Sequence, residues 1–392
     1  MGMLLALIYV CFVSLGLPDS LLGSAWPIMH TEICVPMSYA GIVSMVISVG
    51  TIVSSLMCDK ITHKIGSGRL TAVSIFLTAV ALFGFSMSNR FWMLVLWAVP
   101  YGLGAGGVDA VLNNYVALHY KSQHMSWLHC MWGVGAAISP YIMSFSLIKL
   151  DGWSYGYLIV AVIQIILSAF VFISLPIWKK GSEEEKATDT EYKSAPIKLR
   201  ELIKLPGAVP CLFTFFGYCS LEITSSLWTS TYLVQNRGMD AEAAAGFAST
   251  FYLGITLGRA INGFLAMKFG DRFLIRLGIA VVLVGTACIF IPFHTAFALV
   301  GFVIAGLGCA PIYPCIIHMT PDIFGKDKSQ AMIGIQMAFA YLGFCIMPPI
   351  LGFIVDMTTV ALLPVFILLL LALTAVMHEA LVYKTKKHSK IR

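Results

Sequence analysis

Charged side chains are scarce in this chain. Asp, Glu, Lys and Arg make up only 11% of its 392 residues, whereas 59% of the residues are hydrophobic. Soluble globular domains carry about 25% charged residues, and a chain with far fewer cannot cover its surface with polar groups in water. The composition therefore excludes an ordinary soluble protein and predicts that lipid is the main solvent of this chain.

Motifs that carry enzyme chemistry are also lacking. The sequence has no nucleotide-binding Gly-Lys loop, no H-E-x-x-H and no G-x-S-x-G. Its ten cysteines show no spacing typical of a disulfide framework or a zinc site. The one long polar stretch, 179–204, is too short for an ATPase domain. We therefore expect no enzyme, no cofactor and no metal, and a gradient must supply the energy for any transport.

Long apolar stretches recur along the whole chain. Each is long enough to cross a hydrocarbon core of roughly 30 Å as a helix. The first is too long for a cleaved signal peptide and contains Asp19, so we expect it to stay in the membrane. The sequence thus predicts an all-α integral membrane protein with twelve transmembrane helices, at 3–28, 38–58, 70–88, 91–119, 125–148, 155–178, 207–234, 241–267, 273–292, 295–319, 329–355 and 358–383.

Lys and Arg are unevenly distributed over the predicted loops. Loops on one side hold only Arg90, Lys149 and Arg237, and Arg259 lies within a span, whereas the other 21 of the 25 basic residues lie on the opposite side. Because basic loops stay in the cytoplasm, both termini are expected there, in a cell (inner or plasma) membrane. The net charge of +6 reflects this topology and does not indicate nucleic-acid binding.

The two halves of the chain resemble each other at an offset near 204 residues. Gly50 matches Gly254, and the Gly-Leu-Gly at 102–104 matches the one at 306–308. An ordered series of matches indicates an internal repeat, and a parallel repeat predicts a substrate site between two pseudo-symmetric bundles. The predicted parts are a six-helix bundle at 1–178, a cytoplasmic linker at 179–205, a second six-helix bundle at 206–383 and a basic cytoplasmic tail at 384–392.

The loop after the second span carries a family motif. Residues 59–69, DKITHKIGSGR, resemble the loop G-x-L-x-D-R-x-G-R-[RK] between helices two and three of the major facilitator superfamily, without its leading glycine and with longer spacing. A reduced copy, KFGDR, lies at 268–272. Charge pairs in such loops break when the two halves rock. The expected gating residues in these loops are Asp59, Lys60, Gly66, Arg69, Asp271 and Arg272.

Three segments resemble the fucose permease and sodium-glucose transporter-like branch of that superfamily. They are LPDS at 17–20, GVD at 107–109 and GLGCAPIYP at 306–314. Drug-proton antiporters usually show G-x-x-x-G-P-x-x-G-G in helix five, but GVGAAISPYI at 133–142 keeps the proline without the flanking glycines. The resemblance implies a monomeric carrier that takes up a sugar or a similar small polar solute.

Acids inside the first half are the main candidates for coupling and binding. An ionised carboxylate at mid-membrane is costly unless it is paired, hydrated or protonated. Asp19 and Trp26 are seven residues apart, hence on one helix face, where a carboxylate and an indole suit a hydroxyl-rich ligand. Asp109 is the favoured proton acceptor, and Asn113, one turn later on the same face, is a candidate for substrate binding. The alternatives are a protonated Asp19 bonded to the backbone and an Asp109 that serves as a buried hydrogen-bond strut.

The second half supplies further candidates. Glu222 begins a polar stripe in the seventh span and either faces the substrate, as a possible coupling residue, or pairs with Arg259. Arg259 is expected in a gating pair, with substrate contact as the alternative. His129 could bind substrate or relay a proton to Asp109, although a lone helical histidine is more often a packing residue. The remaining substrate-binding candidates are Trp132, Trp228, Tyr313 and Gln336, and for the last three packing is the alternative.

Prolines lie inside two of the predicted spans. Pro311 and Pro314 remove backbone donors in the tenth span, and Pro348 and Pro349 do so in the eleventh. We expect both helices to bend there, which would give a rocking carrier points of flexure.

Together these features predict a secondary active transporter that works by alternating access. Its expected partners are a small-molecule substrate, a coupling ion (H⁺ or Na⁺) and membrane lipid. One alternative is proton-coupled efflux of amphipathic compounds, which the 12% aromatic content and 19 methionines favour. Another is a membrane receptor or scaffold without transport, which has little reason to keep three buried acids.

Overall fold

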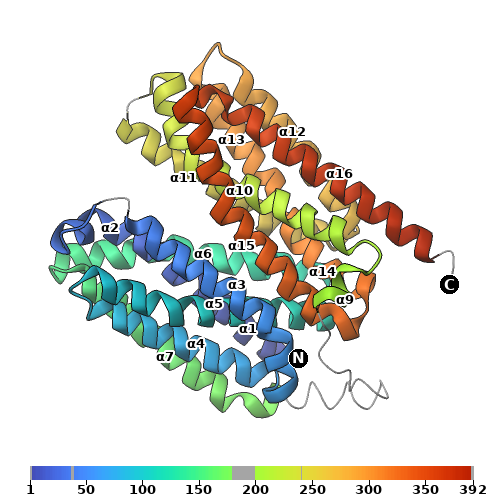
Figure 1. Ribbon diagram of the computed structural model, residues 1–392, viewed down its shortest axis with the longest axis horizontal. Coiled ribbons are helices and arrows are strands. Elements are labelled where there is room, and N and C mark those ends of the chain that lie inside the picture. The colour runs from blue at the N-terminus through green and yellow to red at the C-terminus, as the bar shows by residue number, and fades with distance from the viewer. Residues whose placement is uncertain (1, 37–38, 179–198, 240, 390–392) are drawn as a thin grey trace. The chain divides into compact units, whose positions relative to one another are not determined.

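Helices form the secondary structure of the chain. The computed structural model describes residues 2–36, 39–178, 199–239 and 241–389, and no strand occurs in these ranges (Figure 1). Eleven helical stretches in the described part are long and apolar enough to cross a membrane. The remaining predicted span, 241–267, coincides with helix α11, Ala241–Leu265, many of whose side chains lie outside the described part. The prediction of an all-α membrane protein is confirmed.

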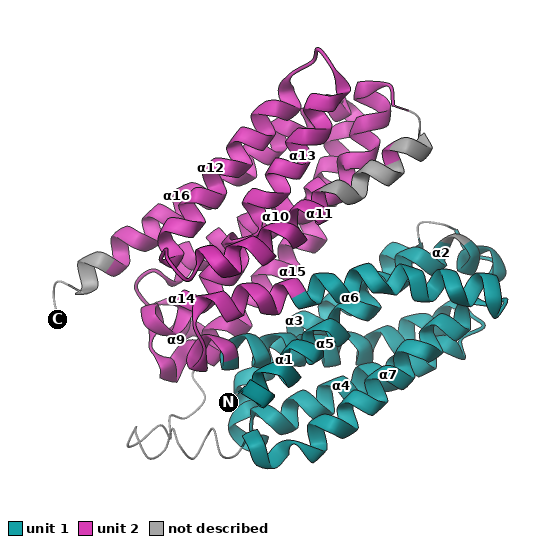
Figure 2. Ribbon diagram, turned by 180° about the vertical axis from the view of Figure 1, so that it is seen from behind, with its two compact units in different colours: residues 1–115, 131–197 teal, residues 116–130, 198–392 magenta. Residues whose placement is uncertain are grey.

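The described helices group into two compact units (Figure 2). Unit 1 comprises residues 1–115 and 131–197, so the start of α6 groups with unit 2. Within unit 1, α7 packs against α4 and α1. The helices of this part of the chain are α1 Gly2–Asp19, α2 Leu21–Glu32, α3 Ala40–Ile65, α4 Ser67–Ser86, α5 Phe91–His119, α6 Ser122–Lys149 and α7 Trp153–Ile173.

Unit 2 comprises residues 116–130 and 198–392. In this unit α10 packs against α11, α15 and α16, and α13 packs against both α11 and α12. Most of the predicted linker, 179–198, lies outside the described residues, and its end forms α9. The helices are α9 Leu199–Ile203, α10 Ala208–Arg237, α11, α12 Asp271–Phe290, α13 Thr295–Cys309, α14 Ile312–Phe324, α15 Lys326–Met357, the 3₁₀ helix η2 Val360–Leu362 and α16 Leu363–Ser389.

Two of the predicted spans are interrupted helices. The first consists of α1 and α2, which separate at Ser20, directly after Asp19. The tenth consists of α13 and α14, which separate beside Pro311, as the prolines there predict. Helix α15 continues through Pro348 and Pro349 without such a break, and the bend expected there stays a prediction.

Close helix crossings recur in both units at the offset that the sequence shows. In unit 1, a Cβ placed on Gly102 of α5 would collide with the carbonyl oxygen of Ile47 and would lie 3.1 Å from Cα of Gly50, both in α3. In unit 2, a Cβ on Gly306 of α13 would collide with the carbonyl oxygen of Phe251 in α11. Since 306 − 102 = 251 − 47 = 204, the same backbone contact occurs twice. Small residues let membrane helices approach this closely, which explains why these glycines match.

Candidate functional site

Asp19 ends α1 at the point where the first span is interrupted. Its Oδ1 accepts a hydrogen bond of 3.0 Å from the hydroxyl of Tyr101 in α5, and its Oδ2 accepts one of 2.8 Å from Nε1 of Trp132 in α6. The side chain is exposed rather than packed away. Neutral donors from two helices therefore orient a carboxylate that stays accessible to a ligand.

Asp109 lies deeper in unit 1, in the middle of α5, and is only 7% exposed. The amide of Asn113, one turn later and fully buried, donates to Oδ1 of Asp109 at 2.8 Å and to its backbone oxygen at 2.9 Å. Among the described residues, no Lys, Arg or His forms an ion pair with Asp19 or Asp109. Their hydrogen-bond partners are all neutral, so each acid can gain or lose a proton without stranding a cation.

Trp26 does not share a continuous helix face with Asp19, because the helix is interrupted between them. The indole is 3% exposed and belongs to an apolar cluster of unit 1 that includes Leu94, Ala98 and Tyr101. Its substrate-binding role stays a prediction. Trp132 is the indole that contacts the Asp19 carboxylate.

Glu222 in α10 lies in a buried polar group of unit 2. The hydroxyl of Tyr218, one turn earlier, donates to its Oε2, and Nη2 of Arg259 in α11 lies 3.6 Å from its Oε1. Glu222 is 8% exposed and Arg259 is 4% exposed. Both carboxylate oxygens thus have partners within the unit. The ion pair of Glu222 with Arg259 was one of the two alternatives that the sequence left open for Glu222.

Aromatic rings surround Tyr313 near this ion pair. The Tyr313 ring centroid lies 4.6 Å from those of both His129 and Phe215, and 6.3 Å from that of Tyr218. Its hydroxyl donates to Sδ of Met337 at 3.0 Å. His129 is 5% exposed, so within unit 2 it packs edge-on against a ring. A proton relay from His129 to Asp109 stays a prediction, since the two residues belong to different units.

Gln336 and Trp228 lie elsewhere in unit 2. Gln336 of α15 is fully buried; its Nε2 donates to Sγ of Cys211 at 2.9 Å, and its amide also bonds Thr320. This arrangement ties α15 to α10 and α14. Trp228 is half-buried, packs beside Gly352 and has no hydrogen-bond partner for its Nε1 within the described part of the chain. Substrate contact by either residue stays a prediction.

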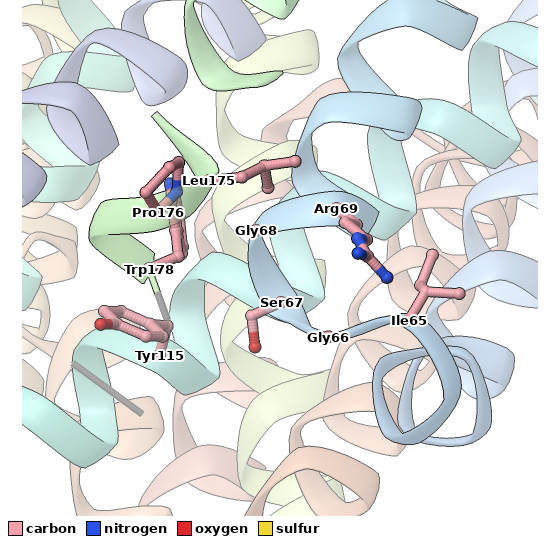
Figure 3. A pocket seen from close by; sticks show the side chains of 9 residues that line it. All are labelled: Ile65, Gly66, Ser67, Gly68, Arg69, Tyr115, Leu175, Pro176 and Trp178. Carbon is pink, nitrogen blue, oxygen red and sulfur yellow. The ribbon is translucent and has the colours of Figure 1, made fainter. Parts of the chain in front are cut away.

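The first predicted gating loop joins α3 to α4. The chain turns at Gly66, whose φ of 82° favours glycine. Asp59 is buried near the end of α3, and its Oδ1 lies 3.5 Å from Nδ1 of His63. Lys60, the next residue, is exposed. A cavity of about 550 Å³ opens beside this loop. Exposed Arg69 and half-buried Ile65 lie on one side of it, and Leu175, Pro176 and Trp178 lie on the other (Figure 3). The remaining lining residues are Gly66, Ser67, Gly68 and Tyr115.

The second predicted gating loop begins α12. Asp271 Oδ1 accepts a hydrogen bond from the hydroxyl of Ser122, and Oδ2 lies 2.7 Å from Nδ1 of His318 in α14. Arg272 follows it and is half-buried. Asp271 therefore connects α12 with α14 and with the start of α6, all within unit 2, while the gating role of both residues stays a prediction.

The sequence profile of the Major Facilitator Superfamily matches residues 8–249 and 214–391. The chain belongs to the major facilitator superfamily. Two curated relatives are 22% identical to it: Bypass of stop codon protein 6 of Saccharomyces cerevisiae, over 93% of this chain and 79% of that protein, and the glucose/mannose transporter GlcP of Bacillus subtilis, over 80% and 77%. A crystal structure of the E. coli fucose:proton symporter FucP superposes with a TM-score of 0.70 at 16% identity, covering 96% of this chain and 98% of that one.

Membership of the major facilitator superfamily settles the coarse predictions. The fold of two six-helix bundles and the resemblance to this superfamily are confirmed, and the chain is a multi-pass membrane transporter rather than an enzyme. The likeness to FucP at 16% identity shows the fold alone.

Two aromatic hydroxyls at the acids were not predicted. Tyr218 precedes Glu222 by four residues, so the i, i+4 rule for helix neighbours could have found it. Tyr101 bonds Asp19 across 82 residues of sequence. No local pattern indicates such a pairing; it needs the packing of α5 against the end of α1.

Proposed function

We propose that this major facilitator superfamily protein takes up a sugar or a similar small polar solute together with a cation, most simply H⁺. The observation that carries the proposal is the pair of acids in unit 1. Asp19 is held by an indole and a phenol and is exposed, whereas Asp109 is held by a side-chain amide and is buried. One acid is thus arranged for a ligand and the other for a proton.

The substrate step uses Asp19 and the ring beside it. A carboxylate accepts hydrogen bonds from vicinal hydroxyls, and an indole face packs against the C–H face of a pyranose. Trp132 places such a ring next to the carboxylate. A neutral sugar would therefore find an oriented acceptor and an apolar platform in one place.

The coupling step uses Asp109. Its carboxylate accepts a hydrogen bond from the Asn113 amide, and an ionised carboxylate inside the membrane is costly. Proton uptake removes that charge. Protonation of Asp109 together with substrate binding at Asp19 would then permit the change between outward-open and inward-open states.

The names of two similar proteins agree with this substrate class. One is a glucose/mannose transporter and the other a fucose:proton symporter. The distribution of Lys and Arg supports a topology with both termini in the cytoplasm. The proposed carrier is a monomer in the cell membrane, and the proposed direction of transport is into the cell.

The test is a substrate-induced pH change outside de-energised cells that contain this protein. A panel of hexoses, deoxyhexoses and polyols is added one at a time in sodium-free buffer. Proton symport predicts alkalinisation with one sugar, lost in Asp109→Asn and kept in the matched control Asp151→Asn, an exposed residue between α6 and α7. A response that appears only with Na⁺ would identify Na⁺ rather than H⁺ as the coupling ion. No response to any compound of the panel, with or without Na⁺, would refute the sugar proposal and favour amphipathic substrates.

A further inference from the structure

Residues 116–130 comprise the end of α5, the turn at 120–121 and the start of α6. This segment, called the connection below, groups with unit 2 rather than with the rest of the first bundle (Figure 2). Polar contacts from several helices of unit 2 hold this connection. The Ser122 hydroxyl donates to Asp271, Asn262 Nδ2 of α11 donates to the Ser126 hydroxyl at 2.7 Å, and the imidazole of His318 lies against the carbonyl oxygen of Tyr120.

His318 faces a hydrogen-bond acceptor at each ring nitrogen. Its Nδ1 lies 2.7 Å from Oδ2 of Asp271, and its Nε2 lies 3.1 Å from the carbonyl oxygen of Tyr120. A carboxylate and a carbonyl can only accept, and a neutral imidazole has a single N–H. Both contacts are hydrogen bonds at once only when His318 is an imidazolium.

Two acidic side chains lie around His318. The charged groups that act on it are Asp271, from α12, and Asp322, one turn later on its own helix, both acidic. The connection 116–130 presents a carbonyl oxygen to it. The His318 and Asp271 side chains are 18% and 12% exposed, so the pair is partly shielded from solvent yet open enough to exchange a proton.

We infer that His318 is a proton-binding switch, separate from Asp19 and Asp109, that fastens the connection 116–130 to α12 and α14 when protonated and loosens it when neutral. The proposal goes beyond symport because it needs no substrate and uses neither acid of the proposed coupling site. On the proposed topology these residues lie at the cytoplasmic ends of their helices. The switch would make the carrier respond to cytoplasmic pH, since an imidazole changes charge between pH 5 and 8.

Proton loss removes one of the two donors. The neutral ring keeps a single N–H, so either the Asp271 carboxylate or the Tyr120 carbonyl loses its partner and faces a nitrogen lone pair. Losing a partly buried hydrogen bond to a charged donor changes a local opening equilibrium by roughly tenfold or more. The other contacts of the connection, including those of Ser122 and Ser126, remain, so the expected effect is local loosening and not unfolding.

Hydrogen–deuterium exchange of the full-length protein in lipid nanodiscs tests the switch. Exchange of peptides from 116–130 is followed between pH 5 and 8.5 and corrected for the intrinsic pH dependence of amide exchange. We expect the wild type to show a step of about tenfold toward faster exchange as the pH rises. A wild type without a step would overturn the proposal, whatever the protein carries.

Two variants fix the charge state of residue 318. His318→Gln, always neutral, should exchange fast at every pH, and His318→Lys, always cationic with several donors, should stay protected at every pH. His63→Gln is the matched control, because His63 also pairs with an aspartate but within α3 alone, and it should keep the wild-type step. Peptides from α7 serve as the folding reference. A folded His318→Gln that keeps the step, or a folded His318→Lys that is loose throughout, would refute the role of the charge.

Discussion

The crossing of α3 and α5 at Gly102 should not tolerate one added methyl group. In Gly102→Ala the new Cβ would overlap the carbonyl oxygen of Ile47 and would crowd Cα of Gly50 at 3.1 Å. Both neighbours are backbone atoms, so no side chain can rotate away and the helices must separate. Overpacking of this kind costs about 1–3 kcal/mol, whereas alanine gains up to about 1 kcal/mol over glycine inside a helix. Because the added Cβ meets rigid backbone, the upper part of the overpacking range, about 2–3 kcal/mol, applies, and the net loss expected is about 1–2 kcal/mol.

That loss converts to a measurable shift. For units of roughly 200 residues, 1 kcal/mol lowers the unfolding temperature by about 2–4 °C, so Gly102→Ala should unfold about 2–8 °C below the wild type in a scan of intrinsic tryptophan fluorescence in detergent. Gly306→Ala should show a similar loss, because its Cβ would meet Phe251 in the repeated contact. Gly23→Ala is the control: it lies in α2 with nothing within 4 Å of the added Cβ, and it should be neutral or stabilising. A Gly102→Ala protein as stable as Gly23→Ala would refute the reasoning.

Three further predictions concern the acids. Asp109→Asn should abolish substrate-induced proton uptake while the protein stays folded, because the amide has nearly the same shape but does not titrate in this range; proton uptake that persists would contradict it. Trp132→Phe removes the donor to Asp19 and should raise the substrate KM roughly fivefold or more, measured by radiolabelled uptake, so an unchanged KM would count against the proposed site. Arg259→Gln should destabilise the protein by about 3 kcal/mol, because it leaves buried Glu222 without its cation. Adding Glu222→Gln should recover most of this loss, measured by thermal unfolding. Purely additive losses in the double variant would show that the two side chains do not interact.

The fold followed from patterns that are local in sequence. Apolar length and the bias of Lys and Arg depend only on composition within a window of about twenty residues, which is why the spans could be placed. The interruption beside Pro311 was predictable for the same reason, since a proline removes a specific backbone donor. The interruption at Ser20 was not, because Pro18 lies inside α1 and the helix ends one residue later, at Asp19.

The site was harder to predict because its contacts span long distances in sequence. The hydrogen bond from Trp132 to Asp19 joins residues 113 positions apart. From the sequence we expected Trp26 as the ring beside the acid, whereas Trp132 lies there, because the pairing depends on how α6 packs against α1. The pairing of Glu222 with Arg259 was one of two stated alternatives, and intramembrane charges favour such pairs in general.

The three acids also differ in what protonation would leave behind. Asp19 and Asp109 accept hydrogen bonds from neutral groups, so a proton on either removes a charge and creates none. Glu222 shares its charge with Arg259, and a proton on Glu222 would leave a buried guanidinium uncompensated, which is costly in a low-dielectric interior. Reversible proton binding is therefore easier in unit 1, and the ion pair of unit 2 is better suited to a fixed charge balance. Within the proposed symport, this places the proton on Asp109 and not on Glu222.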